Sequence, residues 1–288
     1  MLDVLIVGYG DIGRRVARLE QADGRAVTVL VRRPDKLADD PPPQPPAITH
    51  DLDAAQARFS LPESPATLYW FAPPADGGVE DARLDRFLRT LLPHHRPGRL
   101  VYISTSGVYG DCQGAWVDET RPPAPRTDRA RRRLAAERCL LARAERGDME
   151  VVILRVPGIY GPGRLPIERL RQGIPVITPG EAPYSNRIHA DDLARVCVAA
   201  ARYPGPTRVF NVSDGHPTTM TDYFMQVAHW LGMPPPPCIS LAEAKTCFSA
   251  SQLSFVEESR RLDTRLLREQ IGFHPLYPDL AHGLPACL

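Results

Sequence analysis

Hydrophobic and polar positions along the chain form two kinds of segment. Short apolar runs rich in β-branched residues predict buried strands, and they lie at residues 3–7, 26–31, 67–71, 99–104, 150–156 and 207–213. Apolar positions spaced three or four residues apart predict helices, and they begin at residue 11 and recur at residues 79–92, 127–146, 191–203 and 219–232. Alternating strands and helices predict an α/β fold, in which helices cover both faces of a parallel sheet.

Proline residues gather in three runs, at residues 39–47, 121–126 and 233–238. Because proline fixes φ and lacks an amide proton, these runs predict loops. Beyond residue 161 the alternation of strand and helix loosens. We therefore expect a dinucleotide-type domain over residues 1–160 and a smaller lobe over residues 161–288, which is partly interwoven with the sheet at residues 186–213.

Composition narrows the classes of function. A formal net charge of +1 creates no global field that would attract nucleic acid or an acidic membrane surface. No apolar run approaches the roughly 18 residues of a membrane span, and the first residues lack the basic segment of a signal peptide. The six cysteines show no metal-ligand spacing, so we expect no metal site and interpret them as reduced thiols of a cytoplasmic protein.

Three glycines mark the end of the first predicted strand. Gly8, Gly10 and Gly13 fit the pattern G-x-G-x-x-G, in which the glycines permit a tight turn, a close pyrophosphate and close packing of helix on strand. The pyrophosphate would accept hydrogen bonds from amides that begin the helix, so Asp11 and Ile12 are further candidate contacts. The alternative interpretation is a glycine-rich turn without a ligand.

The second predicted strand ends in two arginines, Arg32 and Arg33. A dinucleotide site for NAD usually has an acidic residue here, which accepts hydrogen bonds from the ribose hydroxyls. Arginine instead suits the 2′-phosphate of NADP, through charge-assisted hydrogen bonds. The sequence therefore favours NADP, with NAD as the other possibility, unless both arginines are simply solvated.

Several stretches together are similar to one family. They are "VGYGDIG" (7–13), "HDLDA" (50–54), "VYISTSGVYGD" (101–111), "LRVPGIYGPGR" (154–164), "NRIHADDLA" (186–194) and "VFNVSDGHP" (209–217). In content and order they resemble the extended short-chain dehydrogenase/reductase family, also called the NAD-dependent epimerase/dehydratase family. The resemblance implies a Rossmann-type, doubly wound parallel sheet of about seven strands with a smaller C-terminal substrate lobe.

The resemblance also implies roles for individual residues. Cofactor contacts are expected beside the adenine, the inner ribose and the nicotinamide, at Asp51, Leu52, Ala72, Pro73, Pro157 and Gly158. Thr105 occupies the position of the catalytic Ser/Thr of the family and is expected to contact both cofactor and substrate. Further substrate contacts are expected at Ser106 and Arg187.

The chain departs from the family at the catalytic helix. The family has Tyr-x-x-x-Lys there, whereas this chain has Arg129 and Arg133. Arg133 could still hold ribose hydroxyls, but Arg129 is always protonated and cannot act as a general base. Tyr109 and Tyr160 are candidates to replace the missing acid, and for each the alternative is a packed aromatic side chain. His189 is a weaker candidate, and Tyr184 a weak substrate contact.

This chain lacks residues that two reactions of the family usually require. Sugar-nucleotide dehydratases have an acidic pair after the Ser/Thr, where this chain has Ser106 and Gly107. Sugar-nucleotide epimerases usually have an arginine four residues before the histidine of H-x-x-D, where this chain has Ser185. The sequence therefore supports neither the sugar-nucleotide dehydratase reaction nor the sugar-nucleotide epimerase reaction specifically.

Three hypotheses for function remain. The first is an NADP(H)-dependent oxidoreductase or epimerase-like enzyme that acts on a small carbonyl, hydroxyl or sugar-type compound. The second is a catalytically degenerate regulatory or sensor protein that binds NADP(H), and the third is a scaffold without a ligand. A homodimer through the helices at 79–92 and 127–146 is an open possibility that the arginines of the second helix disfavour.

Overall fold

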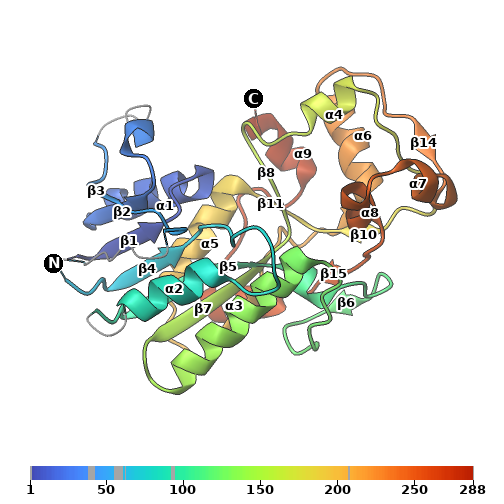
Figure 1. Ribbon diagram of the computed structural model, residues 1–288. Coiled ribbons are helices and arrows are strands. Elements are labelled where there is room, and N and C mark those ends of the chain that lie inside the picture. Colours follow the sequence, from blue (N-terminus) through green and yellow to red (C-terminus); the bar gives the residue numbers. More distant parts are fainter. Residues whose placement is uncertain are drawn as a thin grey trace. The chain divides into compact units, whose positions relative to one another are not determined.

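The predicted apolar runs form a seven-stranded central sheet in the computed structural model, which describes residues 2–37, 43–54, 61, 63–91, 95–206 and 208–287 (Figure 1). The strands lie in the order β12-β7-β5-β4-β1-β2-β3. Their bounds are β1 Val4–Val7, β2 Val27–Val31, β3 Ala47–Thr49, β4 Thr67–Trp70, β5 Arg99–Thr105, β7 Glu150–Val156 and β12 Val209–Asn211. β1 pairs in parallel with both β2 and β4, so the chain reverses its direction of winding there, as in doubly wound dinucleotide folds. The sheet confirms the predicted fold class.

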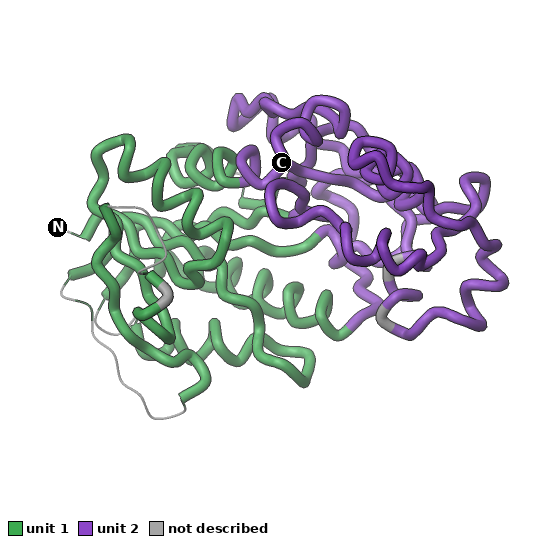
Figure 2. The backbone as a smooth tube through the Cα atoms, turned by 90° about the horizontal axis from the view of Figure 1, so that it is seen from above, with its two compact units in different colours: residues 1–105, 128–155, 194–210 green, residues 106–127, 156–193, 211–288 purple. Residues whose placement is uncertain are grey.

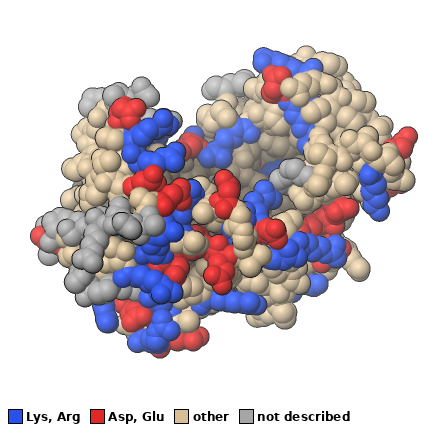
Figure 3. All heavy atoms as spheres, viewed as in Figure 1, with Lys and Arg blue, Asp and Glu red and all other residues tan. Residues whose placement is uncertain are grey.

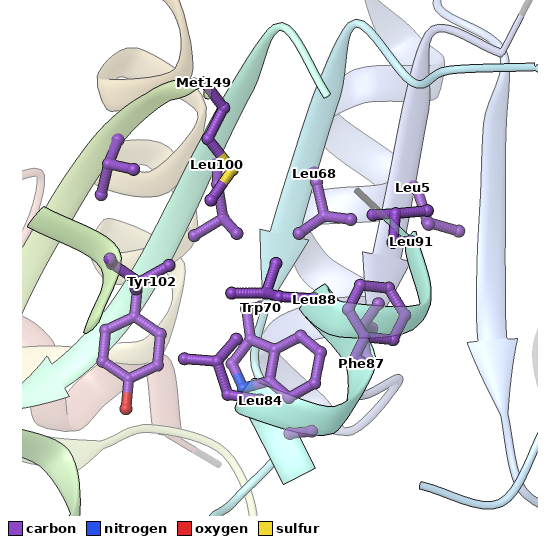
Figure 4. Packing of buried hydrophobic residues seen from close by; sticks show 14 of the residues in the cluster. Leu5, Leu68, Trp70, Leu84, Phe87, Leu88, Leu91, Leu100, Tyr102 and Met149 are labelled. Carbon is purple, nitrogen blue, oxygen red and sulfur yellow. The ribbon is translucent and has the colours of Figure 1, made fainter. Parts of the chain in front are cut away.

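Helices cover both faces of the sheet. They are α1 Asp11–Ala22, α2 Ala82–Leu91, α3 Asp128–Glu145 and α5 Ala190–Arg202. α2 and α3 lie against one face, where Leu84, Phe87 and Leu88 pack around Trp70 of β4 (Figure 4). On the other face, Glu20 of α1 accepts a hydrogen bond from the buried Tyr69 of β4 and ion-pairs with Arg202 of α5.

The chain divides into two compact units, drawn in different colours in Figure 2. Unit 1 comprises residues 1–105, 128–155 and 194–210, and it contains nearly all of the sheet. Unit 2 comprises residues 106–127, 156–193 and 211–288. Residues 194–210 return to the sheet within the stretch 186–213 that was expected to be interwoven with it, whereas residues 106–127 belong to unit 2 although they precede the expected boundary at residue 160.

Unit 2 consists of short elements. Its strands are β6 Trp116–Val117, β8 Gly158–Tyr160, β9 Val176–Ile177, β10 Tyr184–Ser185, β11 Arg187–His189, β13 Thr218–Thr219, β14 Cys238–Ile239 and β15 Arg261–Leu262. Its helices are η2 Ser106–Tyr109, α4 Ile167–Arg171, α6 Met220–Trp230, α7 Leu241–Cys247, α8 Ala250–Val256, the π-helical η3 Leu267–Ile271, α9 Leu280–Gly283 and η4 Leu284–Cys287. A cluster around Tyr160, Tyr223 and Phe224 forms one of its hydrophobic cores.

The predicted elements agree with the observed ones to within a few residues, and β3 is the strand of the sheet that the apolar pattern missed. β3 follows a proline run and is mostly exposed, so it has little apolar signal. Ala47 was placed in the loop predicted for residues 39–47 and instead begins this strand; residues 39–42 of that loop lie outside the described residues. A short 3₁₀ turn, η1 Pro34–Leu37, follows β2.

Candidate functional site

The turn between β1 and α1 and the first turn of α1 contain two glycines that the fold itself requires. Gly8 has a φ of +98°, and a Cβ at this position would overlap the backbone nitrogen of Ala72. A Cβ at Gly13 would lie 2.6 Å from the carbonyl oxygen of Gly8. Both glycines therefore let α1 begin directly against the ends of β1 and β4.

Gly10 differs, because neither its backbone nor its surroundings require glycine. Its φ of −89° and ψ of −161° are open to other residues. A Cβ would meet no atom of the described residues within 4 Å. Gly10 is also the N-cap of α1, whose first-turn amides carry a partial positive charge. The residues present thus fit a pyrophosphate, whose close approach would explain the missing side chain.

A cavity of about 310 Å³ lies beside this turn, at the carboxyl ends of β1, β2 and β4. It brings together many of the predicted cofactor contacts, namely Gly8, Arg32, Arg33, Asp51, Leu52, Ala72 and Pro73. It also contains residues that sequence reasoning missed, namely Tyr9, Arg14, Leu37, His50, Asp53 and Arg83. The guanidinium of Arg14 lies over the ring of Tyr9. Arg14, Arg32 and Arg33 all line the cavity and bring positive charge to it.

Helix α2 fixes the wall of the cavity through two arginines. Arg83 ion-pairs with Asp53 at 2.6 Å and donates a hydrogen bond of 3.0 Å to the carbonyl oxygen of Pro73. Arg86 donates one of 2.8 Å to the carbonyl oxygen of Leu52. The hydrogen bonds from Arg83 lower the pKa of Asp53, so this carboxylate stays ionised. The positive charge of Arg83 balances the negative charge of the carboxylate. These contacts hold together the loops that follow β3 and β4.

Thr105 ends β5 in unit 1, where it is half-buried. Ser104, the preceding residue, donates a hydrogen bond to Glu137 of α3. Glu137 is fully buried and also forms an ion pair of 2.8 Å with the buried Arg155 of β7. Through these two contacts Glu137 attaches α3 to β5 and β7, close to Thr105. Ser106, the residue after Thr105, begins η2 in unit 2 and is buried.

Arg129 is exposed on α3, and Arg133, one turn later, is half-buried. Arg133 donates a hydrogen bond of 3.2 Å to the hydroxyl of Tyr102, and its guanidinium lies 5.5 Å from the centre of that ring. Burial raises the pKa of Tyr102. Neither arginine can release a proton near neutral pH, so this helix lacks the usual acid of its position.

Tyr109 and Tyr160 are both buried within unit 2. The hydroxyl of Tyr109 donates a hydrogen bond of 2.7 Å to Oδ1 of Asn211. The hydroxyl of Tyr160 donates one of 3.2 Å to the carbonyl oxygen of Asp279, and burial raises the pKa of Tyr160. These contacts favour a packing role for each ring over the proton transfer considered from the sequence.

The H-x-x-D stretch of unit 2 anchors residues 276–287, the C-terminal segment. The Asp192 carboxylate accepts hydrogen bonds of 2.9 Å from the amides of Leu276 and Tyr277. The ring of His189 lies against those of Tyr160 and Tyr277, with centroids 5.2 and 4.1 Å away. His189 is fully buried, in keeping with a bracing role.

Arg187, at the start of β11, pairs in register with Gly158 of β8, which follows Pro157. A Cβ at Gly158 would overlap Nη1 of Arg187, so the glycine leaves room for the guanidinium. The amide of Asp214 donates a hydrogen bond of 2.9 Å to the Arg187 carbonyl oxygen. Burial raises the pKa of Asp214 to about 7.

Further findings concern surface charge, membrane and metal binding, and the cysteines. On the face shown in Figure 3, basic side chains lie among acidic ones. Within the described ranges, no helix is both long enough and apolar enough to cross a bilayer, and no cluster of His, Cys, Asp or Glu could hold a metal ion. All six cysteines are free thiols.

Tyr184, the weak substrate candidate, is partly exposed, and its ring centre lies 4.6 Å from the guanidinium of Arg261.

Comparison with known families agrees with this geometry. The model of the NAD dependent epimerase/dehydratase family matches residues 4–213, which include the glycine turn, the cavity and β11. The chain belongs to this family. The match confirms the resemblance inferred from the sequence motifs.

Individual members of the family are similar over different lengths. Protein YeeZ of Escherichia coli K12 is 28% identical over 186 residues, which are 64% of this chain and 61% of YeeZ. A conserved protein of unknown function from Silicibacter pomeroyi has a TM-score of 0.83 and 30% identity, with 99% of this chain and 98% of that chain covered. MoeE5, solved with UDP-glucose and NAD, has a TM-score of 0.72 and 25% identity, with 99% and 96% covered.

Within this family fold, sequence reasoning found the residues marked by short motifs and missed those that act through tertiary contacts. Arg14 had a weak signal, because it follows Gly13 directly in the sequence. Arg83 and Arg86 had none, because their partners Asp53 and Leu52 precede them by 30 and 34 residues in the chain. His50 and Asp53 flank the two predicted adenine contacts, and neighbouring residues of one loop often share a cavity.

Proposed function

We propose that this protein is an NADP(H)-dependent oxidoreductase or epimerase-like enzyme that acts on a small carbonyl, hydroxyl or sugar-type compound. The observation that carries the proposal is Gly10, a glycine that the surrounding protein does not require, beside a cavity lined by four arginines, of which Arg83 is paired with Asp53. MoeE5, a relative at 25% identity, was solved with NAD and UDP-glucose, which supports a nicotinamide cofactor and a sugar-type substrate.

In this proposal the cofactor would contact the residues named from the sequence, most of which lie in unit 1. Amides of Gly10, Asp11, Ile12 and Gly13 would bind the pyrophosphate, and Gly8 would keep the turn tight. The adenosine would lie against the cavity residues Asp51, Leu52, Ala72 and Pro73. Arg133 would donate to ribose hydroxyls, and Pro157 and Gly158 would lie by the nicotinamide. When bound, the cofactor supplies or accepts a hydride.

The preference for NADP rests on charge. Arg32 and Arg33 are exposed residues that line the cavity together with Arg14. The carboxylate of Asp53 is already paired with Arg83, so it would offer little repulsion to a 2′-phosphate. Guanidinium groups form strong, often bidentate hydrogen bonds with phosphate.

On the substrate side, Thr105 would orient the reacting oxygen and Ser106 would lie beside it. Because the hydroxyls of Tyr109 and Tyr160 are hydrogen-bonded within buried surroundings, we do not assign proton transfer to either. Loss of a general acid or base typically lowers the rate by about 10²–10⁴-fold, so we expect slow turnover.

Calorimetric titration with NADPH and with NADH tests the proposal. We expect NADPH to bind more tightly, and Arg32→Ala and Arg33→Ala each to weaken NADPH binding by about 10- to 100-fold with little effect on NADH. Arg89→Ala is the matched control, because Arg89 is exposed on α2 and lies outside this cavity. Equal affinity for the two nucleotides, or preference for NADH, would refute the assignment of NADP.

A catalytically degenerate NADP(H) sensor is the second candidate. Its supporting observation is α3, where Arg129 and Arg133 stand in place of Tyr and Lys. Absorbance of the reduced nicotinamide separates the two functions. Turnover of NADPH with any member of a carbonyl and sugar panel indicates an enzyme, whereas tight NADPH binding without turnover indicates a sensor.

Location and assembly belong to the same proposal. Six free thiols, three of them buried, support a reducing compartment such as the cytoplasm. A homodimer through α2 and α3 would have to accommodate the arginines of α3, and light scattering of the purified protein measures whether it forms.

A further inference from the structure

A second cavity of unit 1 lies along helices α2 and α3. Its volume is about 510 Å³, and it is lined by residues of both helices and of the segment just before α2. Of its described lining residues, none is assigned to the cofactor or to the substrate. Its apolar walls are formed by Ala82, Leu84, Ala135 and Ala136, together with the half-buried Cys139.

Asp81 is a buried acid of this cavity with one oxygen that is not engaged. The residue is 5% exposed. Its Oδ1 accepts a hydrogen bond of 3.1 Å from the amide of Leu84 and so caps α2. Its Oδ2 is buried without a hydrogen-bond partner among the described residues. Burial raises the pKa of this carboxyl group, and the positive charges of Arg133 and Arg83 partly offset that rise.

The contrast with Glu137, a buried acid of α3, shows why this arrangement needs an explanation. Both oxygens of Glu137 are engaged, Oε1 with the hydroxyl of Ser104 and Oε2 with the guanidinium of Arg155. A buried carboxylate oxygen without a donor is costly, because it has lost its hydration without a replacement. Asparagine or serine would cap the helix as well as aspartate does. Capping alone therefore does not account for a buried aspartate at position 81.

The other charged side chains of the cavity favour a cation as its occupant. Arg89 ion-pairs with Asp85 at 2.7 Å, and Arg86 donates a hydrogen bond of 2.8 Å to a backbone carbonyl oxygen. Glu80 is exposed and has no ion pair among the described residues. An anion in the cavity would therefore lie near two unpaired carboxylates, those of Glu80 and Asp81, whereas a cation would gain from both.

The cation that fits is organic. Within the part of the chain that the structure describes, no three His, Cys, Asp or Glu side chains lie close enough together to hold a metal ion. The alanines and Leu84 offer apolar surface, which suits methylene groups and gives no ligand atoms to a metal.

We propose that this cavity binds an aliphatic amine, whose ammonium group donates a hydrogen bond to Oδ2 of Asp81 and whose methylene groups lie against the alanines. Hydrogen bonds between ammonium and carboxylate are charge-assisted, and they are stronger where water is excluded. Glu80 contributes a second negative charge. The described residues of this cavity differ from those of the cofactor cavity, so the inference does not rest on the proposed function.

Calorimetric titrations with three probes of similar length test the assignment on the full chain. 1,4-Diaminobutane is a cation, 1,4-butanediol is neutral and succinate is an anion. We expect the diamine to bind about tenfold more tightly than the diol, and succinate to bind more weakly than either. Asp81→Asn should weaken diamine binding by about 10- to 100-fold. Glu145→Gln is the matched control, because it removes an exposed charge of α3 outside the cavity and should leave diamine binding unchanged.

Two variants separate binding from folding. Asp81→Asn keeps a good capping residue and removes an unpaired buried charge, so it should melt at the temperature of the wild type or higher. Ala135→Leu fills the cavity from α3 with another good helix former, and it should abolish diamine binding without unfolding the protein.

The thiol of Cys139 provides a second readout. A bound diamine covers this thiol, so its alkylation by iodoacetamide should slow by about tenfold at about ten times the Kd. Mass spectrometry of the peptide that contains Cys139 measures the rate. Cys247 is an exposed thiol of unit 2, and its rate should not change.

Five results would overturn the inference. Three concern affinity: diamine binding no tighter than that of the diol or succinate, wild-type binding of the diamine by Asp81→Asn, and wild-type binding by Ala135→Leu. The fourth is a large loss of thermal stability in Asp81→Asn, which would assign Asp81 to folding. The fifth is light scattering that shows a wild-type dimer which Asp81→Asn dissociates, because a second copy would then occupy the cavity in place of an amine.

Discussion

Replacing each glycine of the first turn by alanine separates the positions that the fold requires from the one that a ligand requires. At Gly8, a φ of +98° costs an L-residue about 1–3 kcal/mol, and overlap with the backbone of Ala72 adds about 1–3 kcal/mol. We therefore expect Gly8→Ala to lower the free energy of unfolding by about 2–6 kcal/mol. Gly13→Ala only overpacks the turn and should lower it by about 1–3 kcal/mol.

Gly10→Ala should leave the free energy of unfolding within about 1 kcal/mol of the wild type. Its backbone angles suit alanine, and the added methyl group meets no described atom within 4 Å. Loss of glycine at the N-cap costs about 0.5–1 kcal/mol, which a smaller unfolded-state entropy offsets by about 0.4–1 kcal/mol. The methyl group instead obstructs the pyrophosphate. The same overpacking of about 1–3 kcal/mol then weakens NADPH binding by about 5- to 150-fold.

Urea unfolding and calorimetric titration with NADPH, on the wild type and the three variants, measure both quantities. The reasoning predicts that stability and affinity change independently, with stability lost at Gly8 and affinity lost at Gly10. A Gly10→Ala protein that unfolds as easily as Gly8→Ala, or that binds NADPH as tightly as the wild type, would refute it.

Three other predictions concern buried polar groups. Glu137→Ala removes the carboxylate that is ion-paired with the buried Arg155 and should lower the free energy of unfolding by about 3–5 kcal/mol in urea, whereas Asp128→Ala, which breaks an exposed pair, should change it by less than about 1 kcal/mol. Asp192→Ala leaves two amides of the C-terminal segment without their acceptor, and we expect limited proteolysis to remove that segment faster than in the wild type; equal rates would contradict the anchoring role. Asp214 has its pKa raised from 3.8 to about 7, so the folded state binds its proton more tightly than the unfolded state and stability falls as pH rises through this interval. Asp214→Asn should remove that fall, and urea midpoints measured from pH 4 to pH 8 test it.

Local sequence patterns sufficed to predict the framework of the fold. Each strand of the sheet that is buried on both faces appears as an apolar run, because every side chain in it meets a helix. Gly8 and Gly13 could be identified from the G-x-G-x-x-G spacing, although the close contact of Gly8 with Ala72, just after β4, appears only in the structure. β3 escaped notice because an exposed edge strand has little apolar signal.

The candidate site could be predicted only where a motif marks it. The glycine turn and the arginines after β2 are such motifs, and the structure places them around one cavity. The role of Tyr109 depends on a partner 102 residues away, so its sequence neighbours could not show that its hydroxyl is already engaged. Arg83 likewise reaches Asp53, 30 residues earlier, across two loops.

The sequence by itself determined which segments become strands and helices, and where the backbone must turn without a side chain. Only the tertiary structure decided which charges are paired. Arg155 and Arg187 are both arginines in or near apolar strands, yet one meets Glu137 and the other meets Met220 and Tyr223. The physical reason is that burial and hydrogen bonding depend on what packs against a side chain, and packing joins segments that are remote along the chain.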